Sequence, residues 1–307
     1  MEKTQKFAGR LSLLAAAFIW GTSFIVLKNS LGSMGPLWIL TIRFTVSALL
    51  LSALSFRKLK TMPKSTLKGS TLLGIVLAAA YILQTYGLKY TTPGKNSFLT
   101  TVNCVLVPFI AWAIFKKKPS GANIAAGIMS LAGIGFVSLG SADGGFNTGD
   151  MLTLSCGVFY ALHIILVEKY ASGGDAGAVT AVQFASASAV TLAGALMFED
   201  FPAAVPGSVW LGIAYLCIMC TALCYYLQAW GIKYTPASTA SVLLCFESVF
   251  ATVCSVIFCH EKITAKLLIG FALLFASVIL SELNPGFSFR AKGKRAAVLN
   301  PSCDSTT

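Results

Sequence analysis

Two short stretches of this chain repeat one another. Residues 84–91 read QTYGLKYT, and residues 228–235 read QAWGIKYT. The spacing of 144 residues between them also places Tyr81 on Tyr225. One matched stretch would be weak evidence for a repeat, but the same spacing also relates residues before and after it. The sequence therefore consists of two related halves.

The repeat also relates polar residues that lie inside apolar stretches. The spacing of 144 places the neutral Asn103 on the acidic Glu247, so the common scaffold does not require a charge at this place. In the earlier part of each half the spacing is 140, and it pairs Trp20 with Tyr160, Arg43 with Gln183 and Phe44 with Phe184.

The composition excludes an ordinary soluble protein. Of the 307 residues, 56% are hydrophobic and 11% are charged, and the mean hydropathy is +0.78. A soluble domain carries about a quarter charged residues, so lipid must be the solvent for most of this surface. A helix that spans a bilayer needs ~20 mainly apolar residues. Ten stretches meet this need: residues 11–28, 36–56, 70–89, 96–115, 121–141, 149–168, 177–198, 208–231, 237–259 and 263–283.

Each half contains five of these stretches, an odd number, so the second half enters the membrane with the opposite orientation. Inverted repeats are an architecture of transporters, with the substrate site near mid-membrane at the repeat interface. The sequence predicts an all-α integral membrane fold of ten transmembrane helices, built as two inverted five-helix repeats. The halves are residues 1–143 and 144–284, and a basic cytoplasmic tail follows at 285–307.

The net charge of +12 comes from 23 Lys and Arg residues against 11 Asp and Glu residues. The basic residues lie in short clusters between apolar stretches, which encodes orientation in a membrane and argues against a nucleic-acid partner. With the N-terminus in the cytoplasm, few basic residues fall outside: Lys28, Lys89, Lys95, Lys262 and Lys266. We predict a multi-pass protein of the cytoplasmic (inner) membrane with both termini in the cytoplasm.

Two charged residues lie well inside predicted spans, namely Glu247 and Arg43. A charge at the bilayer centre costs about 2.5–3.5 kcal/mol on insertion scales, so it usually faces a cavity or a partner. Glu247 is a candidate for substrate contact or proton coupling, and Arg43 for contact with a carboxylate or another anion. The structural alternative is an ion pair or a hydrogen-bonded buried charge. If the two residues pair in one conformation only, the proton affinity of Glu247 would change with conformation.

A second set of polar and aromatic residues is a candidate lining for the same cavity. Tyr81 and Gln84 share a helical face, as do their repeat counterparts Tyr225 and Gln228. Hydrogen bonds between helices are the alternative role for every member of the set. The set is Trp20, Tyr81, Gln84, Asn103, Tyr160, His163, Gln183, Tyr225 and Gln228.

No cofactor or metal centre is predicted. The nine cysteines are scattered, and most lie inside apolar stretches. Cys217, Cys220 and Cys224 share one helical face, but that stretch contains no His, and cysteine commonly packs as a small hydrophobic residue. The pattern does not support a disulfide framework.

Several short motifs together resemble one family. They are Trp20–Phe24 (WGTSF), Arg43-Phe44, Gly87–Tyr90 (GLKY), Leu243–Val249 (LLCFESV) and the turn His260–Lys262. On these residues the chain resembles the EamA-type members of the drug/metabolite transporter superfamily, over residues of about 8–284. The sequence departs from the family pattern at Lys116–Lys118, where an acidic turn is common, and at Ser248, where many relatives have Pro. The resemblance implies a transporter that alternates between inward and outward states, often an exporter of amino acids or other metabolites.

The preferred function is a secondary transporter, an exporter of small metabolites such as amino acids. The chain has no phosphate-binding loop for a pump and no hydrolase or metalloprotease motif, so we predict that it is not an enzyme. The alternatives are a multidrug or cation efflux transporter, an intramembrane enzyme and a channel. The expected partners are a small-molecule substrate and lipid, and the chain would act as a monomer or a homodimer.

Overall fold

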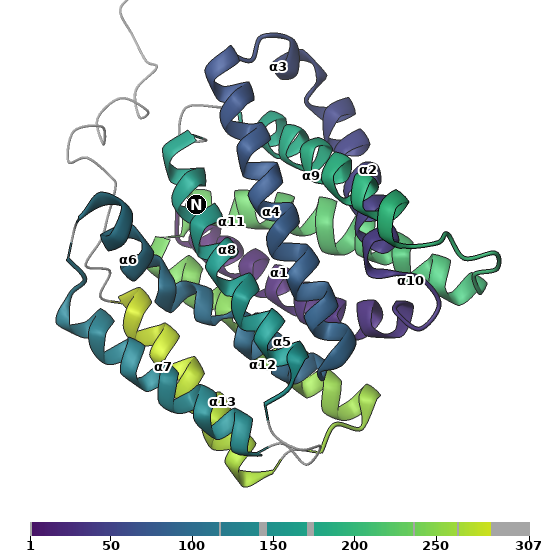
Figure 1. Cartoon of the computed structure of the whole chain (residues 1–307). Helices are drawn as coiled ribbons and strands as arrows, with labels where there is room; N and C mark the ends of the chain where they lie inside the picture. The colour runs from purple at the N-terminus through teal and green to yellow at the C-terminus, as the bar shows by residue number, and fades with distance from the viewer. Residues whose placement is uncertain are drawn as a thin grey trace, which may run out of the picture.

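A computed structural model describes residues 2–116, 118–140, 146–170, 175–235, 237–262 and 264–283. Within these residues helices are the regular secondary structure, and no strand occurs (Figure 1). The predicted tail at 285–307 and the predicted boundary between the halves at residues 143 and 144 lie outside the described residues.

The helices follow one another with short connections. In chain order they are α1 (Glu2–Ser30), α2 (Pro36–Leu54), α3 (Phe56–Lys60), α4 (Lys64–Tyr90), α5 (Pro93–Thr100), α6 (Val102–Phe115), α7 (Gly121–Gly140), α8 (Thr148–Tyr170), α9 (Ala176–Phe198), α10 (Gly207–Cys217), the π-helical turn η1 (Ile218–Leu223), α11 (Cys224–Tyr234), α12 (Ala237–Cys259) and α13 (Ala265–Leu283).

The expected class of helical membrane protein is confirmed. Among the described residues, seven helical stretches are long and apolar enough to cross a membrane: Thr4–Ser30, Pro36–Leu54, Lys64–Tyr90, Pro93–Phe115, Thr148–Val167, Ala176–Phe198 and Gly207–Gln228. Three shorter apolar helices are Gly121–Val137, Leu243–Cys259 and Ala265–Ser281. Each of the ten predicted stretches overlaps one helix or a run of consecutive helices. The outer surface is apolar, as lipid requires, with Leu131, Phe198 and Leu211 at 70%, 75% and 75% exposure.

The predicted stretches differ most clearly from the helices of the structure in four places. Helices α1 and α4 begin at Glu2 and Lys64, well before residues 11 and 70, because the helices continue into polar residues that an apolar pattern does not count. The stretch 96–115 is interrupted at Thr101, which separates α5 from α6. There the N–H of Cys104 bonds to the Thr101 carbonyl only three residues back, a tightened turn. The stretch 208–231 contains the π-helical turn η1, which the pattern does not indicate.

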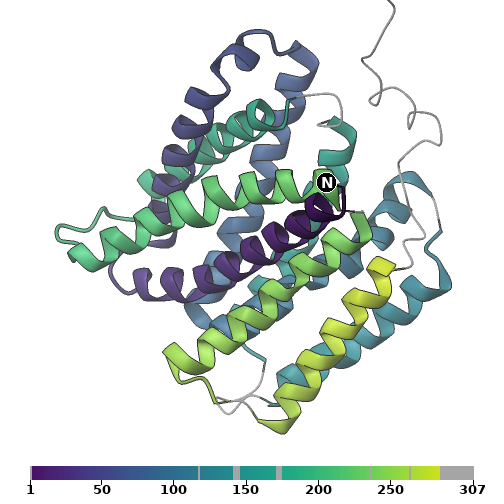
Figure 2. The same ribbon diagram turned by 180° about the vertical axis from the view of Figure 1, so that it is seen from behind.

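The helix contacts are repeated when the two halves are exchanged. Helix α4 of the first half packs on α8 of the second half, and the run α10–η1–α11 of the second half packs on α1 of the first half. Helices α5 and α6 pack on α8, as α12 packs on α1. The pairs α2 with α9 and α7 with α13 join each helix to its own counterpart. Figure 1 shows α7 and α13 side by side at one edge of the bundle, and Figure 2 shows α1 between α12 and the run from α10 to α11.

A polar cavity between the halves as the candidate functional site

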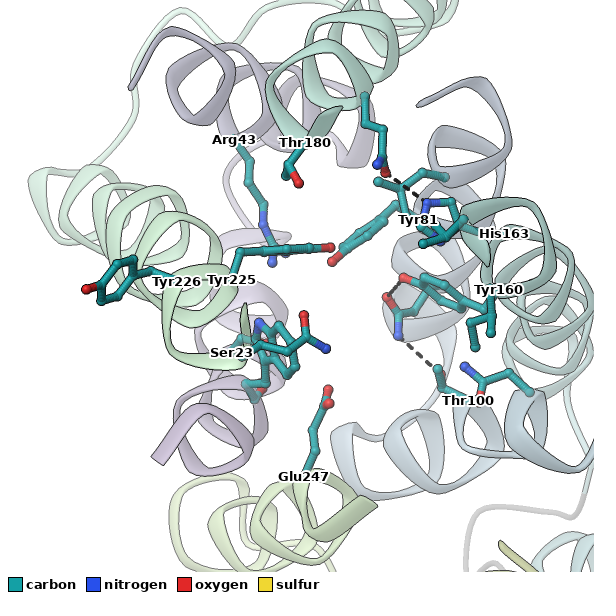
Figure 3. Close-up of a pocket in the computed structure, with 18 of the residues that line it drawn as sticks. Ser23, Arg43, Tyr81, Thr100, Tyr160, His163, Thr180, Tyr225, Tyr226 and Glu247 are labelled. Carbon is teal, nitrogen blue, oxygen red and sulfur yellow. Dashed lines mark hydrogen bonds between the residues drawn. The ribbon is translucent and has the colours of Figure 1, made fainter. Parts of the chain in front are cut away.

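A cavity of about 760 Å³ lies among the helices of both halves. Every residue that the sequence singled out contributes to its lining (Figure 3). By element these residues are Trp20 on α1, Arg43 on α2, Tyr81 and Gln84 on α4, Asn103 on α6, Tyr160 and His163 on α8, Gln183 on α9, Tyr225 and Gln228 on α11, and Glu247 on α12. The fold therefore brings together residues that are more than 200 positions apart in sequence.

The aromatic wall of the cavity has the symmetry of the repeat. Trp20 meets Tyr225 edge-on with ring centroids 5.8 Å apart, and their counterparts Tyr160 and Tyr81 meet edge-on at 5.6 Å. Phe44 contacts Tyr81 at 5.2 Å, and Phe184 contacts Tyr225 at 5.2 Å. The remaining pair, Phe44 and Phe184, stacks at 5.7 Å. Edge-on and offset pairs are the favoured aromatic geometries, and both halves use the same contacts beside the cavity.

Most polar groups of the lining are satisfied by other protein groups. The Tyr160 hydroxyl donates to Gln84 Oε1 at 2.8 Å, and Gln84 Nε2 donates to Thr100 Oγ1 at 3.2 Å. His163 Nε2 and Gln183 Oε1 are 3.0 Å apart and hydrogen-bonded. These groups connect helices across the cavity wall, which is the structural role left open for them by the sequence.

Arg43 and Glu247 are different, because their charges are not neutralised by each other. Among the described residues no ion pair joins them, and Glu247 makes no hydrogen bond to protein. Arg43 is 3% exposed and uses only its Nε, which donates to Thr221 Oγ1 at 2.8 Å. In the same cavity lining, the Oδ1 of Asn103 is buried without a partner. Figure 3 shows Glu247 and Arg43 entering the cavity from different walls.

Close packing of α1 on α12 places Glu247. An added Cβ at Gly21 would lie 2.9 Å from the backbone N of Ala251 and 3.0 Å from the carbonyl O of Glu247. Real Cβ atoms do not approach backbone this closely, so only glycine allows the two helices to cross at this depth. The glycine of the WGTSF motif thus sets the position of the Glu247 backbone.

The two ends of the cavity differ. At one end the lining reaches Ala176 and Gly177, the first residues of α9. At the other end it stops at Leu27 and Thr100. Beyond Leu27, the Nζ of Lys28 donates to three carbonyls at the end of α4, those of Leu88, Lys89 and Thr91, at 2.7, 3.1 and 2.8 Å. We name this second end the latched end.

At the latched end, carboxylates of the second half accept hydrogen bonds from groups of the first half. Glu199 accepts from the N–H of Leu37 at the start of α2 at 3.0 Å, and from the Tyr86 hydroxyl at 2.7 Å. Glu261 accepts from the Thr92 hydroxyl and, at 3.2 Å, from the N–H of Gly94 at the start of α5. A helix N-terminus favours an anion, so each contact joins complementary charges.

A buried ion pair completes the latched end. Lys95 Nζ lies 2.6 Å from Asp150 Oδ2, and both side chains are almost fully buried. Asp150 also accepts from the Thr91 hydroxyl at 2.6 Å. The sequence placed Lys95 outside the spans and did not single out any of these acids. Ser23 of the cavity lining was missed too, although it is the repeat counterpart of His163.

The model of the EamA-like transporter family matches residues 7–139 and again residues 147–283. The chain belongs to this family. The resemblance drawn from the short motifs is thereby confirmed. Within the described residues, no group of three or more His, Cys, Asp or Glu side chains could hold a metal ion.

Relatives of this EamA-like chain are named as transporters. One from Archaeoglobus fulgidus, named an uncharacterized transporter, is 29% identical over 284 residues, or 92% of this chain and 88% of the relative. YvbV of Bacillus subtilis, also named an uncharacterized transporter, is 25% identical over 305 residues, or 97% of each chain. A solved crystal structure with 20% identity has a TM-score of 0.65 and covers 90% of this chain and 96% of its own, which shows a shared fold.

Proposed function

We propose that the chain is a secondary transporter that exports small metabolites such as amino acids by alternating access, with the cavity as its substrate site. The observation that carries this proposal is the pair of opposite charges, Arg43 and Glu247, which face one cavity without neutralising each other. A charge buried without a partner is costly, so a ligand that supplies the missing partner would be bound selectively. A small zwitterion presents a carboxylate for Arg43 and an ammonium group for Glu247.

The size of the cavity supports a small-molecule substrate. Its volume of about 760 Å³ falls within the range of about 300–1,000 Å³ that is typical of ligand sites. The family relation supports a membrane transporter, and the chain carries no phosphate-binding loop for a pump. We therefore assign the driving force to a gradient, with Glu247 as the coupling group.

Two inverted repeats of five spans, residues 1–143 and 144–284, are supported by matching glycine contacts. A Cβ at Gly87 would lie 2.9 Å from the Gly149 carbonyl O, and a Cβ at Gly231 would lie 2.9 Å from the Gly9 carbonyl O. The repeat spacings place Gly87 on Gly231 and Gly9 on Gly149. The α4–α8 crossing and the α11–α1 crossing are thus equally close at equivalent glycines, just as the aromatic contacts of the two halves are equivalent.

Alternating access is supported by the unequal ends of the cavity. At the latched end, Glu261 and Asp150 join the halves through acid contacts. The repeat counterparts of these acids are the basic residues Lys117 and Arg10. The same contacts are therefore impossible at the other end, which must close through different interactions when the latched end opens.

The function is tested by uptake into proteoliposomes. The panel consists of L-amino acids, organic acids, nucleosides and cationic dyes, each with and without an imposed pH gradient. We expect saturable uptake of one or more amino acids that the gradient accelerates by about 5- to 150-fold, the range of typical coupling free energies. Uptake of cationic dyes alone would favour the multidrug alternative, for which the aromatic wall beside Glu247 is suitable. Flux that never saturates would favour a channel, and chemical conversion of a panel member would favour an enzyme.

The proposed location is the cytoplasmic membrane, with both termini in the cytoplasm and the latched end outside. Reporter fusions after Lys118 and after Pro285 are expected to report a cytoplasmic position, and a fusion after Asp143 an external one. An external signal after Pro285 would show that the number of crossings is odd and that the ten-span topology is wrong. Cross-linking of the detergent-purified protein distinguishes a monomer from a homodimer.

A further inference from the structure

A π-helical turn lies beside the cavity. The turn η1 (Ile218–Leu223) is a π-helix between α10 and α11. Its repeat counterpart, residues 74–79, lies within the regular helix α4. π-Helical turns are rare and occur frequently at functional sites. The repeat scaffold therefore does not require a π-helical turn at this place. The turn occurs at residues 218–223, which contact Arg43, and not at the counterpart residues 74–79.

The turn, together with Cys217, the last residue of α10 directly before it, is hydrogen-bonded to the helices that carry Trp20 and Arg43. The carbonyl of Cys220 accepts from Trp20 Nε1 on α1 at 2.6 Å, and the carbonyl of Cys217 accepts from Ser47 Oγ on α2 at 3.3 Å. The thiols of Cys217 and Cys220 also lie within hydrogen-bond distance of carbonyls on α2 and α1. Cys217 and Cys220, which the sequence indicated only as packing residues, thus join this part of the chain to α1 and α2.

Thr221 is the side chain through which this turn reaches Arg43. Its hydroxyl donates to the Leu216 carbonyl, five residues back, at 2.8 Å. Because that bond uses the only hydroxyl proton, the oxygen is left as an acceptor. Arg43 Nε donates to this oxygen at 2.8 Å. The π-helical register thus fixes both the position and the donor–acceptor direction of Thr221.

The rest of the Arg43 guanidinium is free to bind a ligand. The Cζ of Arg43 lies 5.0 Å from the centroid of the Tyr81 ring, which covers one face of the group. Nε is used by Thr221. In the part of the chain that the structure describes, the N–H groups on the two Nη atoms have no protein acceptor. These N–H groups form a planar fork that matches a carboxylate.

We propose that η1 and Thr221 position Arg43 as a preorganised carboxylate-binding fork, so that Thr221 is a positioning residue and the Nη edge of Arg43 is the anion subsite of the cavity. The proposal deepens the proposed function and rests on it for the identity of the substrate. A fixed fork binds an anion more tightly than a mobile one, because little side-chain freedom is lost on binding. Loss of the Thr221 hydroxyl should therefore weaken carboxylate binding even though Thr221 does not touch the ligand.

The test measures anion binding without transport. Protein labelled with ¹⁵N-arginine is titrated in detergent with sodium acetate and, at equal ionic strength, with acetamide, which has the same shape without the charge. The Arg43 Nε–H signal, assigned by its loss in Arg43→Lys, is expected to shift and saturate with acetate only. Thr221→Val is expected to move this signal in the free protein and to raise the acetate Kd about tenfold, and Thr221→Ser to restore both.

A matched variant separates positioning from general packing. Thr41→Val removes another buried threonine hydroxyl, which bonds only to the Leu37 carbonyl of its own helix. It is expected to leave the acetate Kd unchanged. An unchanged Kd in folded Thr221→Val, or equal losses in both variants, would overturn the positioning role. If Thr221→Val does not fold, a raised acetate Kd in Thr221→Ser, which keeps the hydroxyl, would overturn the positioning role as well.

The result is independent of whether amino acids are transported. A wild-type Arg43 signal that ignores acetate would overturn the anion subsite, even if the panel showed transport. Saturable acetate binding with no amino-acid uptake would instead keep the subsite and reject the proposed substrate. In uptake assays, Thr221→Val is expected to raise KM for carboxylate substrates with little change in the maximal rate.

Discussion

Replacing Glu247 with Gln is expected to abolish the dependence of uptake on an imposed pH gradient. The change keeps the size of the side chain and its capacity to accept hydrogen bonds, but it removes the titratable group. Its repeat counterpart Asn103 is already an amide, so the fold tolerates an amide at this place. We expect folded, membrane-inserted protein whose gradient-driven uptake falls about 100-fold, the upper part of the range for a coupling free energy of 1–3 kcal/mol.

The measurement compares proteoliposomes with and without the gradient. Asp200→Asn is the matched control, because Asp200 is exposed and lies outside the cavity lining. It should leave both rates at the wild-type level. Wild-type uptake by Glu247→Gln under both conditions would reduce Glu247 to a structural residue and would remove the basis for coupling.

The repeat made much of the candidate site predictable. Polar residues inside apolar stretches must face protein or a cavity, and residues at repeated positions have equivalent neighbours in the structure. Tyr81 and Tyr225, which the repeat spacing pairs, therefore make equivalent contacts in the cavity. Tyr81 contacts Tyr160, and Tyr225 contacts Trp20, the repeat counterpart of Tyr160. The binding role of these residues stays a prediction, since their placement alone does not test it.

The unpredicted features depend on distances between helices. Lys95 and Asp150 are both near the ends of apolar stretches, where charged residues usually reach water, so no pattern indicated that they pair while buried. The π-helical turn is hydrogen-bonded to Trp20 on α1 through the Cys220 carbonyl and to Arg43 on α2 through the Thr221 hydroxyl. A hydropathy pattern describes the residues of one helix at a time, so it does not indicate contacts between helices.

Glycine contacts are a further feature of this kind, because a sequence shows small residues without showing what approaches them. Gly21 and Gly157 are both buried, and both lie inside helices. At Gly157 an added Cβ would meet nothing closer than 3.6 Å. At Gly21 it would meet backbone atoms at 2.9 and 3.0 Å. The same substitution is therefore expected to have opposite effects at the two positions.

Gly21→Ala is expected to destabilise the protein and to disable transport. Backbone atoms of α12 cannot rotate away as a side chain can, so α1 and α12 must separate. Forced overpacking of this kind costs about 1–3 kcal/mol, occasionally more. The separation would also displace Glu247, whose carbonyl is one of the atoms in contact. We expect a lower thermal unfolding midpoint in detergent, together with a loss of gradient-driven uptake that exceeds the loss of folded protein.

Gly157→Ala is the control for the chemistry of the substitution. Alanine favours a helix over glycine by about 1 kcal/mol, so this variant should unfold at the wild-type temperature or above and transport normally. Equal midpoints and equal uptake for the two variants would contradict the close α1–α12 crossing. A lowered midpoint with wild-type uptake per folded molecule in Gly21→Ala would show that the crossing stabilises the bundle without positioning Glu247.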